Sequence, residues 1–235
     1  MIPIIDYTKY PKPRSRHHVS SNQYLPRDQI CIEPRYYPPL RPQIEWCAHF
    51  VNGRAPEYLD IGCGMGRFLL EMALREPSVN ILGLEVREYA VRWIRRVIDG
   101  ERPRGILGNA EALWYNVANG LPFCSDASIR KIFYLFPDPW FKKRHHYRRA
   151  FTVAFLNECA RVLRSDGILY LMTDVPDVDR YQREILCQHG GFVIEECSDD
   201  AEWEEIPVHT DQEEFCLRKG IPYTRIRCYK RTTER

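Results

Sequence analysis

The chain has 235 residues, of which 44% are hydrophobic and 28% are charged, and its formal net charge is +2. This composition supports one substantial core and excludes a chain that is disordered throughout. No apolar run approaches the roughly 18 residues of a membrane-spanning helix, and the N-terminus lacks the apolar region of a signal peptide. The nine cysteines have neither CxxC nor zinc-ligand spacing. We therefore expect a cytoplasmic protein without a metal site.

Charge is distributed unevenly along the chain. Residues 195–214 hold ten Asp and Glu and no Lys or Arg, which leaves +12 on the remainder. We interpret the acidic stretch as a solvated surface loop. Residues 1–42 contain eight of the 17 prolines and no glycine, and tyrosines alternate there with arginines. We expect 1–42 to be a basic, flexible N-terminal extension, either a plain leader or an arm that lies along a polyanion.

From residue 43 to residue 235, apolar strands alternate with amphipathic helices. This pattern predicts one α/β domain with a mostly parallel central sheet and helices on both faces. The expected strands are 58–62, 80–86, 104–109, 129–135 and 167–173, with two late strands at 192–197 and 225–230. The expected helices are 44–51, 67–75, 87–98, 111–117, 147–163 and 176–189.

A glycine loop, GCGMG at 62–66, follows the first expected strand. Glycine lets the backbone approach a ligand closely, and the next helix offers free N–H groups at its start. Asp60 and Glu85 lie near the ends of the first two strands, where a carboxylate can accept hydrogen bonds from an adenosine cofactor. NAD and S-adenosylmethionine both fit. Arg67 occupies the third glycine position of a GxGxxG motif, which favours S-adenosylmethionine.

A second chemical motif, FPDPWFKKRHHYRR, occupies residues 136–149. Pro137 and Pro139 fix the backbone on both sides of Asp138, so this stretch must be a stiff loop. It follows an expected strand, and in open α/β sheets ligands bind at the carboxyl ends of strands. The Lys and Arg that follow indicate a phosphate or nucleic-acid ligand. A solvated basic turn would explain these cations, but neither the Pro-Asp-Pro sequence nor Trp140.

Five stretches in sequence order resemble the tRNA (guanine-N7-)-methyltransferases, from about residue 58 to the C-terminus. They are DIGCGMGRF at 60–68, GLEV at 83–86, GNAEAL at 108–113, LFPDPWFKKRHHYRR at 135–149 and TD at 173–174. The resemblance implies a Rossmann-like class I methyltransferase that uses S-adenosylmethionine. It also implies methylation of N7 of the variable-loop guanosine, position 46 in tRNA nucleotide numbering.

The same resemblance implies roles for individual residues. It makes Asp138 the catalytic residue. The implied cofactor-binding residues are Asp60, Gly62, Gly64, Glu85, Val86, Asn109, Ala110 and Leu135. The implied substrate-binding residues are Lys142, Arg144, His145, Asp174, Thr210 and Glu213. The chain departs from the family at Gln212, where many bacterial members have Phe, and at Asn109, where others have Asp.

Two other functions remain open on the sequence. The chain could methylate another RNA or a small molecule, or it could be a cofactor-binding, non-catalytic RNA-binding subunit. Amino-group methyltransferases usually carry an Asn/Asp-Pro-Pro-aromatic motif, which Asp138-Pro139-Trp140 matches only in part. An inactive subunit is expected to lose one of the acids, and Asp60, Glu85 and Asp138 are all present. We expect tRNA as the partner, no membrane, and a monomer or homodimer with or without an accessory protein.

Overall fold

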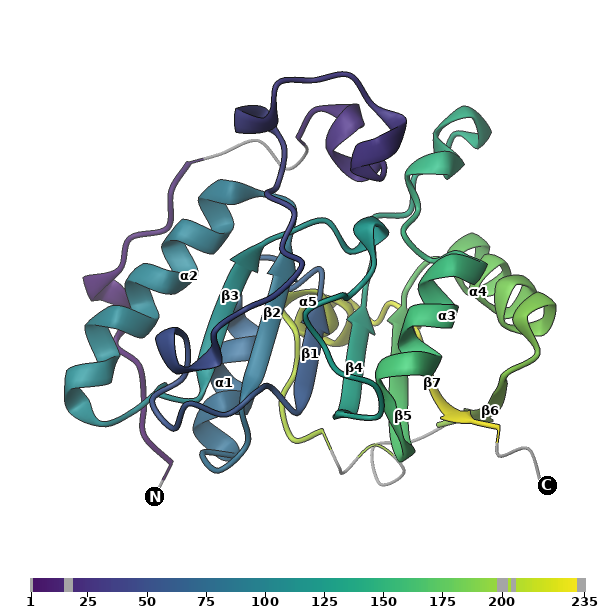
Figure 1. Ribbon diagram of the computed structural model, residues 1–235. Helices are drawn as coiled ribbons and strands as arrows, with labels where there is room; N and C mark the ends of the chain where they lie inside the picture. Colours follow the sequence, from purple (N-terminus) through teal and green to yellow (C-terminus); the bar gives the residue numbers. More distant parts are fainter. Residues whose placement is uncertain (1, 15–18, 198–202, 204–205, 232–235) are drawn as a thin grey trace. The chain divides into compact units, whose positions relative to one another are not determined.

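The computed structural model describes residues 2–14, 19–197, 203 and 206–231. It divides into two compact units, Met1–Asn119 and Gly120–Arg235, each of which contains β-strands and α-helices (Figure 1). We refer to them as the N-terminal and C-terminal units. Among the described residues, no helix is both long and apolar enough to cross a membrane.

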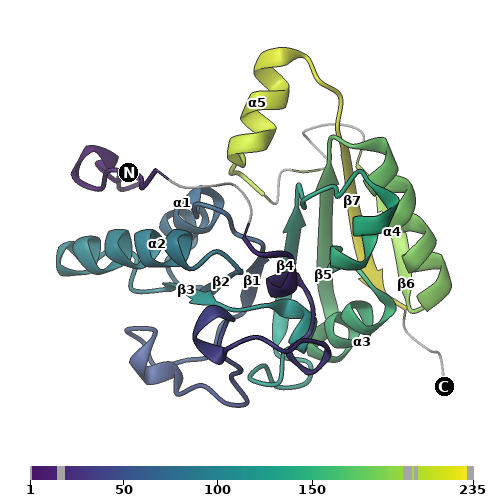
Figure 2. The same ribbon diagram turned by 90° about the horizontal axis from the view of Figure 1, so that it is seen from above.

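The N-terminal unit contains parallel strands in the order β3-β2-β1. The strands are β1 (Tyr58–Ile61), β2 (Ile81–Glu85) and β3 (Ala110–Trp114), and the helices that connect them are α1 (Arg67–Arg75) and α2 (Glu88–Glu101). Figure 2 shows both helices on the same side of the strands. Nearly every strand residue is buried, as is typical of parallel strands covered on both faces. Because the strands are parallel, their carboxyl ends share one edge of the sheet.

Gly66 allows α1 and α2 to approach each other closely. It precedes α1 with a φ of 75°, in the left-handed region that favours glycine. A Cβ atom at this position would lie 2.6 Å from Cγ1 of Ile94 in α2. The third glycine of the loop therefore serves packing, and the first two remain candidates for ligand contact.

The described part of the 1–42 extension packs on the N-terminal unit. The Tyr10 hydroxyl donates to Glu101 at 2.9 Å, and Trp93 Nε1 donates to the Tyr10 carbonyl at 2.9 Å. Tyr37 is only 1% exposed, and its hydroxyl donates to the Leu25 carbonyl at 2.6 Å. These contacts hold Tyr10 and Tyr37 against the unit, and the burial of Tyr37 leaves its ring unavailable to stack on a base.

The C-terminal unit has strands in the order β4-β5-β7-β6. β4 and β5 are parallel, whereas β7 is antiparallel to both β5 and β6. Helices α3 and α4 contact each other and β5. The strands are β4 (Ile129–Leu135), β5 (Leu163–Thr173), β6 (Phe192–Glu196) and β7 (Thr224–Lys230), and the helices are α3 (Val153–Val162), α4 (Pro176–His189) and α5 (Asp211–Lys219).

The predicted α/β class with a mostly parallel sheet is confirmed, but four element predictions are wrong. The helix expected at 44–51 is only a short 3₁₀ helix, Trp46–Ala48. The third strand is Ala110–Trp114 and not 104–109, because Gly105 and Leu107 have φ values of 76° and 60° that interrupt an extended chain. The segment 111–117 is therefore not a helix. The helix expected from residue 147 begins at Val153, where the Thr152 side chain accepts from Phe155 N. The acidic 195–214 stretch contributes residues to both β6 and α5.

Candidate active site

Glu85 ends β2 and organises the glycine loop. Its side chain is 4% exposed. Its Oε2 accepts from Gly64 N at 2.9 Å, and its Oε1 accepts from Arg87 N at 3.0 Å. The Arg87 guanidinium also donates to both carboxylate oxygens, at 3.0 Å each. Glu85 is thus a paired carboxylate that fixes the loop backbone at the carboxyl end of β2.

Asp60, in β1, differs from Glu85 because one of its carboxylate oxygens has no hydrogen-bond donor. It is 4% exposed, and its Oδ2 is buried with no hydrogen-bond partner. Burial, together with the nearby Glu85 charge, raises the pKa of Asp60 to about 8. A buried polar atom without a partner is costly, which indicates that a ligand supplies the missing donor.

The backbone beside these acids leaves room for a ligand. Gly62 has a φ of 78°, and a Cβ placed on it would meet no atom within 4 Å. S-adenosylmethionine carries hydrogen-bond donors on its amino group and ribose hydroxyls. The unsatisfied Asp60 oxygen, the open face of Gly62 and the α1 N-terminus therefore fit this cofactor. Val86 follows Glu85, and its carbonyl accepts from Trp114 Nε1 at 2.9 Å.

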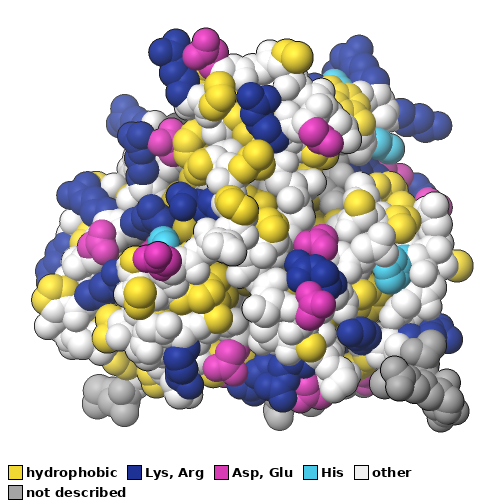
Figure 3. All heavy atoms as spheres, in the orientation of Figure 1, with side chains coloured by type: hydrophobic (Ala, Val, Ile, Leu, Met, Phe, Trp, Pro, Cys, Tyr) yellow, Lys and Arg dark blue, Asp and Glu magenta, His cyan; other side chains and the backbone are white. Residues whose placement is uncertain are grey.

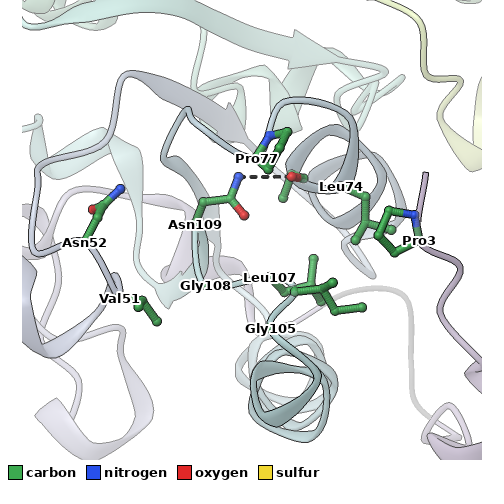
Figure 4. Close-up of a pocket in the computed structure, with 11 residues that line it drawn as sticks. Pro3, Val51, Asn52, Leu74, Pro77, Gly105, Leu107, Gly108 and Asn109 are labelled. Atoms are coloured by element: carbon green, nitrogen blue, oxygen red, sulfur yellow. Dashed lines mark hydrogen bonds between the residues drawn. The ribbon is translucent and has the colours of Figure 1, made fainter. Parts of the chain in front are cut away.

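Asn109 and Ala110 do not lie at this edge. The resemblance assigns both to the cofactor, but Asn109 precedes β3 and Ala110 begins it. They are therefore at the amino ends of the strands, opposite to Glu85. Asn109 Nδ2 donates to three carbonyl oxygens at 2.8–3.1 Å, and one of these bonds is drawn in Figure 4. These bonds tie β3 to the end of α1, and we interpret Asn109 as a structural residue.

Asn109 instead lines a cavity of about 380 Å³ that no sequence pattern predicts (Figure 4). Most of its lining is apolar, from Pro3, Val51, Leu74, Pro77 and Leu107. Its lining residues from 51–52, 77 and 105–109 precede β1, β2 and β3, respectively. The cavity thus opens at the amino ends of the strands and contains none of the glycine-loop residues.

Asn116, and not Asn109, lies beyond the carboxyl end of the third strand. It lies two residues beyond the carboxyl end of β3 and is 2% exposed. Its Nδ2 donates to the carbonyls of Gln23 and Leu25 at 2.9 and 2.8 Å and to the Tyr37 hydroxyl at 3.1 Å. The 1–42 extension therefore contacts this edge of the sheet. The sequence signal for this position is an Asn that follows the apolar strand 110–114. A third strand predicted at 104–109 points to Asn109 instead.

The Pro-Asp-Pro loop leaves the carboxyl end of β4. Leu135 is the last strand residue, and Asp138 is exposed. Two non-glycine residues flank the Pro-Asp-Pro sequence in the left-handed region, Phe136 with a φ of 47° and Trp140 with a φ of 46°. Such residues cost of the order of 1–3 kcal/mol each and are concentrated at functional sites. The predicted stiff loop is confirmed, with strain that the sequence did not reveal.

Cationic side chains follow this loop. Lys142 and Arg144 are exposed, and His145 is half-buried. Burial and the neighbouring arginines lower the pKa of His145, so its imidazole is neutral at neutral pH. The Arg148 guanidinium lies 4.9 Å from the centre of the Trp140 ring. Figure 3 shows Lys, Arg and His side chains gathered over this turn, at the upper right. The arrangement offers charges for phosphate and ring faces for bases.

Asp174 follows β5 and is half-buried. Gln212 Nε2 donates to its Oδ2 at 2.8 Å, and the Cys216 thiol lies 3.7 Å from the same oxygen. Gln212 is the position at which the chain departs from the resemblance noted in the sequence. In this chain, a polar side chain of α5 therefore orients the carboxylate to which the resemblance assigns a substrate contact.

Thr210 and Glu213 have structural roles that the sequence did not predict. They form a capping box at the start of α5, in which Thr210 Oγ1 accepts from Glu213 N at 2.9 Å. Glu213 is 1% exposed and accepts from Arg225 Nη2 at 2.8 Å and from the Tyr223 hydroxyl at 3.2 Å. This network orders α5. It gives Glu213 a role in positioning its neighbours.

Residues 54–226 match a family model described as a putative methyltransferase. A tRNA (guanine-N(7)-)-methyltransferase of Thermosynechococcus vestitus is 34% identical over 77% of this chain and 83% of that protein. The protein of the same name from Microcystis aeruginosa is 31% identical over 91% of this chain and 96% of its own length. The one from Mus musculus is 34% identical over 72% of this chain and 65% of its own length.

Solved structures show the same fold at low identity. A 16S rRNA methyltransferase, KamB, superposes with a TM-score of 0.54 at 14% identity, over 78% of this chain and 90% of that one. A precorrin-6y C5,15-methyltransferase from Geobacter metallireducens gives 0.50 at 18% identity, over 74% and 78%. These matches confirm the Rossmann-like class I methyltransferase fold expected from the sequence.

Proposed function

The chain belongs to the tRNA (guanine-N7-)-methyltransferase family, and from this premise we propose that it transfers a methyl group from S-adenosylmethionine to N7 of a guanosine in tRNA. We further propose that the target is the variable-loop guanosine at position 46 in tRNA nucleotide numbering. One observation in the structure carries the proposal: Asp138 is an exposed carboxylate on a conformationally strained loop that cationic side chains follow.

The proposed cofactor site lies in the N-terminal unit. When bound, S-adenosylmethionine supplies an electrophilic methyl group on a sulfonium. Asp60 is proposed to accept a hydrogen bond from the cofactor through its unsatisfied Oδ2. Glu85 holds the Gly64 amide in place and is proposed to accept from the ribose, with Gly62 and Val86 beside it.

Methyl transfer to guanine N7 does not require a strong general acid or base. Guanine N7 has an in-plane lone pair and no proton to lose, so catalysis is mostly positioning, which can supply roughly 7–11 kcal/mol. The N1–H and N2–H₂ groups of guanine are donors. Asp138 or Asp174 can accept from that edge and leave N7 free. A carboxylate also stabilises the positive charge that develops on the ring as the methyl group is transferred.

Recognition of the tRNA is proposed to use the exposed cations. We propose that Lys142 and Arg144 contact phosphates and that the neutral His145 imidazole contacts the base, while Trp140 with Arg148 offers a stacking surface. Phosphate contacts fix the orientation of the RNA but carry no sequence information. We therefore propose that Asp138 or Asp174 selects guanosine. We propose a cytoplasmic enzyme, active as a monomer or homodimer.

Mass spectrometry of nucleosides tests the proposal directly. Unmodified tRNA is incubated with the protein and S-adenosylmethionine and then digested to nucleosides. We expect N7-methylguanosine, and far less of it when Asp138→Ala protein is used. A methyl group on another base or on a ribose would point to a different RNA methyltransferase. Binding of cofactor and tRNA without any methylated product would point to a non-catalytic subunit.

A further inference from the structure

We propose that Arg149 is a positioning residue that holds the 136–140 loop, and with it Asp138, in its strained conformation. Sequence reasoning groups Arg149 with the cations that contact phosphate. The structure gives it a different environment, since its side chain is 5% exposed. The proposal rests on the methyltransferase function above and adds to it a residue through which Asp138 acts.

The loop needs an external support because its own backbone supplies little. Pro137 and Pro139 have no N–H to donate. Phe136 and Trp140 are both held at positive φ, in a region that large side chains rarely adopt. On the strand side, Phe136 N donates to the Met172 carbonyl at 2.7 Å. The opposite side of the loop requires an anchor of its own.

Arg149 provides that anchor. Its Nε and Nη2 both donate to the Pro139 carbonyl oxygen, at 3.1 and 2.7 Å. Nη2 also donates to Asp177 Oδ2 at 3.0 Å, which ties the guanidinium to the first turn of α4. The guanidinium carbon lies 4.7 Å from the centre of the Tyr181 ring. One side chain therefore connects the carbonyl next to Asp138 to a helix of the same unit.

The geometry requires arginine and not simply a positive charge. A guanidinium presents several donors in a fixed plane, so it can bind one carbonyl with two N–H groups and still reach a carboxylate. A lysine ammonium is a compact point charge and has no such plane. The charge is also neutralised by Asp177, whose pKa the Arg149 hydrogen bond lowers. These contacts leave Arg149 ill-suited to binding phosphate.

The test compares Arg149→Gln and Arg149→Lys with Arg180→Gln. Arg180 is exposed and pairs with the same Asp177, so its loss removes one positive charge and one Asp177 contact but leaves Pro139 untouched. Turnover and tRNA affinity are measured for each variant, together with hydrogen–deuterium exchange of peptides that cover residues 132–142. S-adenosylhomocysteine binding reports whether the N-terminal unit is intact.

We expect Arg149→Gln to lower turnover by about 10- to 100-fold, as a small misplacement of a reacting group does. Its salt dependence of tRNA binding should equal that of wild type, and exchange at 136–140 should rise. Arg149→Lys, which preserves charge and most of the volume, should remain well below wild type in turnover. It also serves as the second variant if Arg149→Gln does not fold. Arg180→Gln should match wild type in turnover and exchange.

Two results would overturn the proposal. Wild-type turnover in Arg149→Lys with a flatter salt dependence in Arg149→Gln would make Arg149 a phosphate contact. Lower turnover without any change in exchange at 136–140 would mean that it does not act through the loop. If the wild-type protein methylates no tRNA, the proposed function fails. A rise in exchange in the variants would still support the loop contact, so the two failures are distinguishable.

Discussion

The two groups of acidic residues in this protein are controlled by different means. In the N-terminal unit, Asp60 and Glu85 are each 4% exposed, and burial determines their chemistry. Glu85 accepts hydrogen bonds from Arg87 and the Gly64 amide, whereas Asp60 has a raised pKa and an unsatisfied oxygen. In the C-terminal unit, Asp138 is exposed, and backbone geometry controls it through two left-handed residues and the Arg149 contact. A buried acid suits a ligand that brings its own donors. An exposed acid on a rigid loop suits a large substrate.

Asp138 should show the largest effect. Asp138→Asn keeps the size of the side chain but removes its charge, so we expect turnover to fall by roughly 10²–10³-fold, as when a group that stabilises transition-state charge is lost. Affinity for S-adenosylhomocysteine, measured by isothermal titration, should stay at the wild-type value. A parallel loss of cofactor affinity would place Asp138 in the cofactor site and remove the distinction between the two groups.

Asp60 should make cofactor binding depend on pH. The cofactor's donors favour the ionised carboxylate, whereas the free protein keeps Asp60 protonated below its pKa of about 8. Affinity for S-adenosylhomocysteine should therefore rise between pH 6 and pH 8, by at most about tenfold per unit, with release of a proton on binding. Titrations in two buffers of different ionisation enthalpy measure that proton.

Asp60→Asn provides the matched control. The variant should bind about 10- to 100-fold more weakly at pH 8, which corresponds to the roughly 1.5–3 kcal/mol of a hydrogen bond to a charged group. Its affinity should lack the rise with pH. In the free wild-type protein, the raised pKa means that the free energy of unfolding falls as pH rises from about 4 to 8, because the unfolded state loses this proton first. Urea denaturation should show a smaller fall in Asp60→Asn.

Two glycines of the same loop should separate packing from ligand contact. Gly66→Ala places a Cβ 2.6 Å from Ile94, so we expect a loss of about 1–3 kcal/mol in the free energy of unfolding. Gly62→Ala meets no neighbour and should lose only the roughly 1 kcal/mol of a left-handed alanine, but it should weaken cofactor binding. Equal losses of stability in both variants would contradict this division.

Arg148 should have the smallest effect, confined to electrostatics. It is partly exposed and stacked on Trp140, so Arg148→Gln should reduce the slope of log affinity for tRNA against log salt by about 0.7–0.9, the value of one phosphate contact. Filter binding over a range of salt concentrations measures the slope. An unchanged slope would identify Arg148 as a solvated cation and direct the search for the tRNA surface elsewhere.

Sequence predicted the elements that carry strong local signals. The strand at 129–135 and the helix at 176–189 have the predicted bounds, because a dense apolar run and a proline at the first turn mark them. The third strand was misplaced because AEALW has apolar residues at spacings that suit helix or strand. The motif residues Asp60, Glu85 and Asp138 were found because their chemistry is local in sequence.

Contacts between residues that lie far apart in the sequence could not be predicted in this way. The Arg149 contact with Pro139 spans ten residues, and its neutralisation by Asp177 spans 28. The Glu213 contact with Arg225 depends on where α5 ends. In the sequence, Arg148 and Arg149 are adjacent identical residues; only the fold decides that one is partly exposed and the other buried. Roles that depend on burial follow from tertiary structure and not from residue type.

The most direct test of the account is the methylation of two transcripts of one tRNA, one with guanosine and one with adenosine at position 46. Each is incubated with wild-type protein and S-adenosylmethionine, and its nucleosides are analysed by mass spectrometry. We expect close to one N7-methylguanosine per molecule in the first transcript and none in the second. Equal N7-methylguanosine in both, or a methyl group on any other atom, would contradict this expectation.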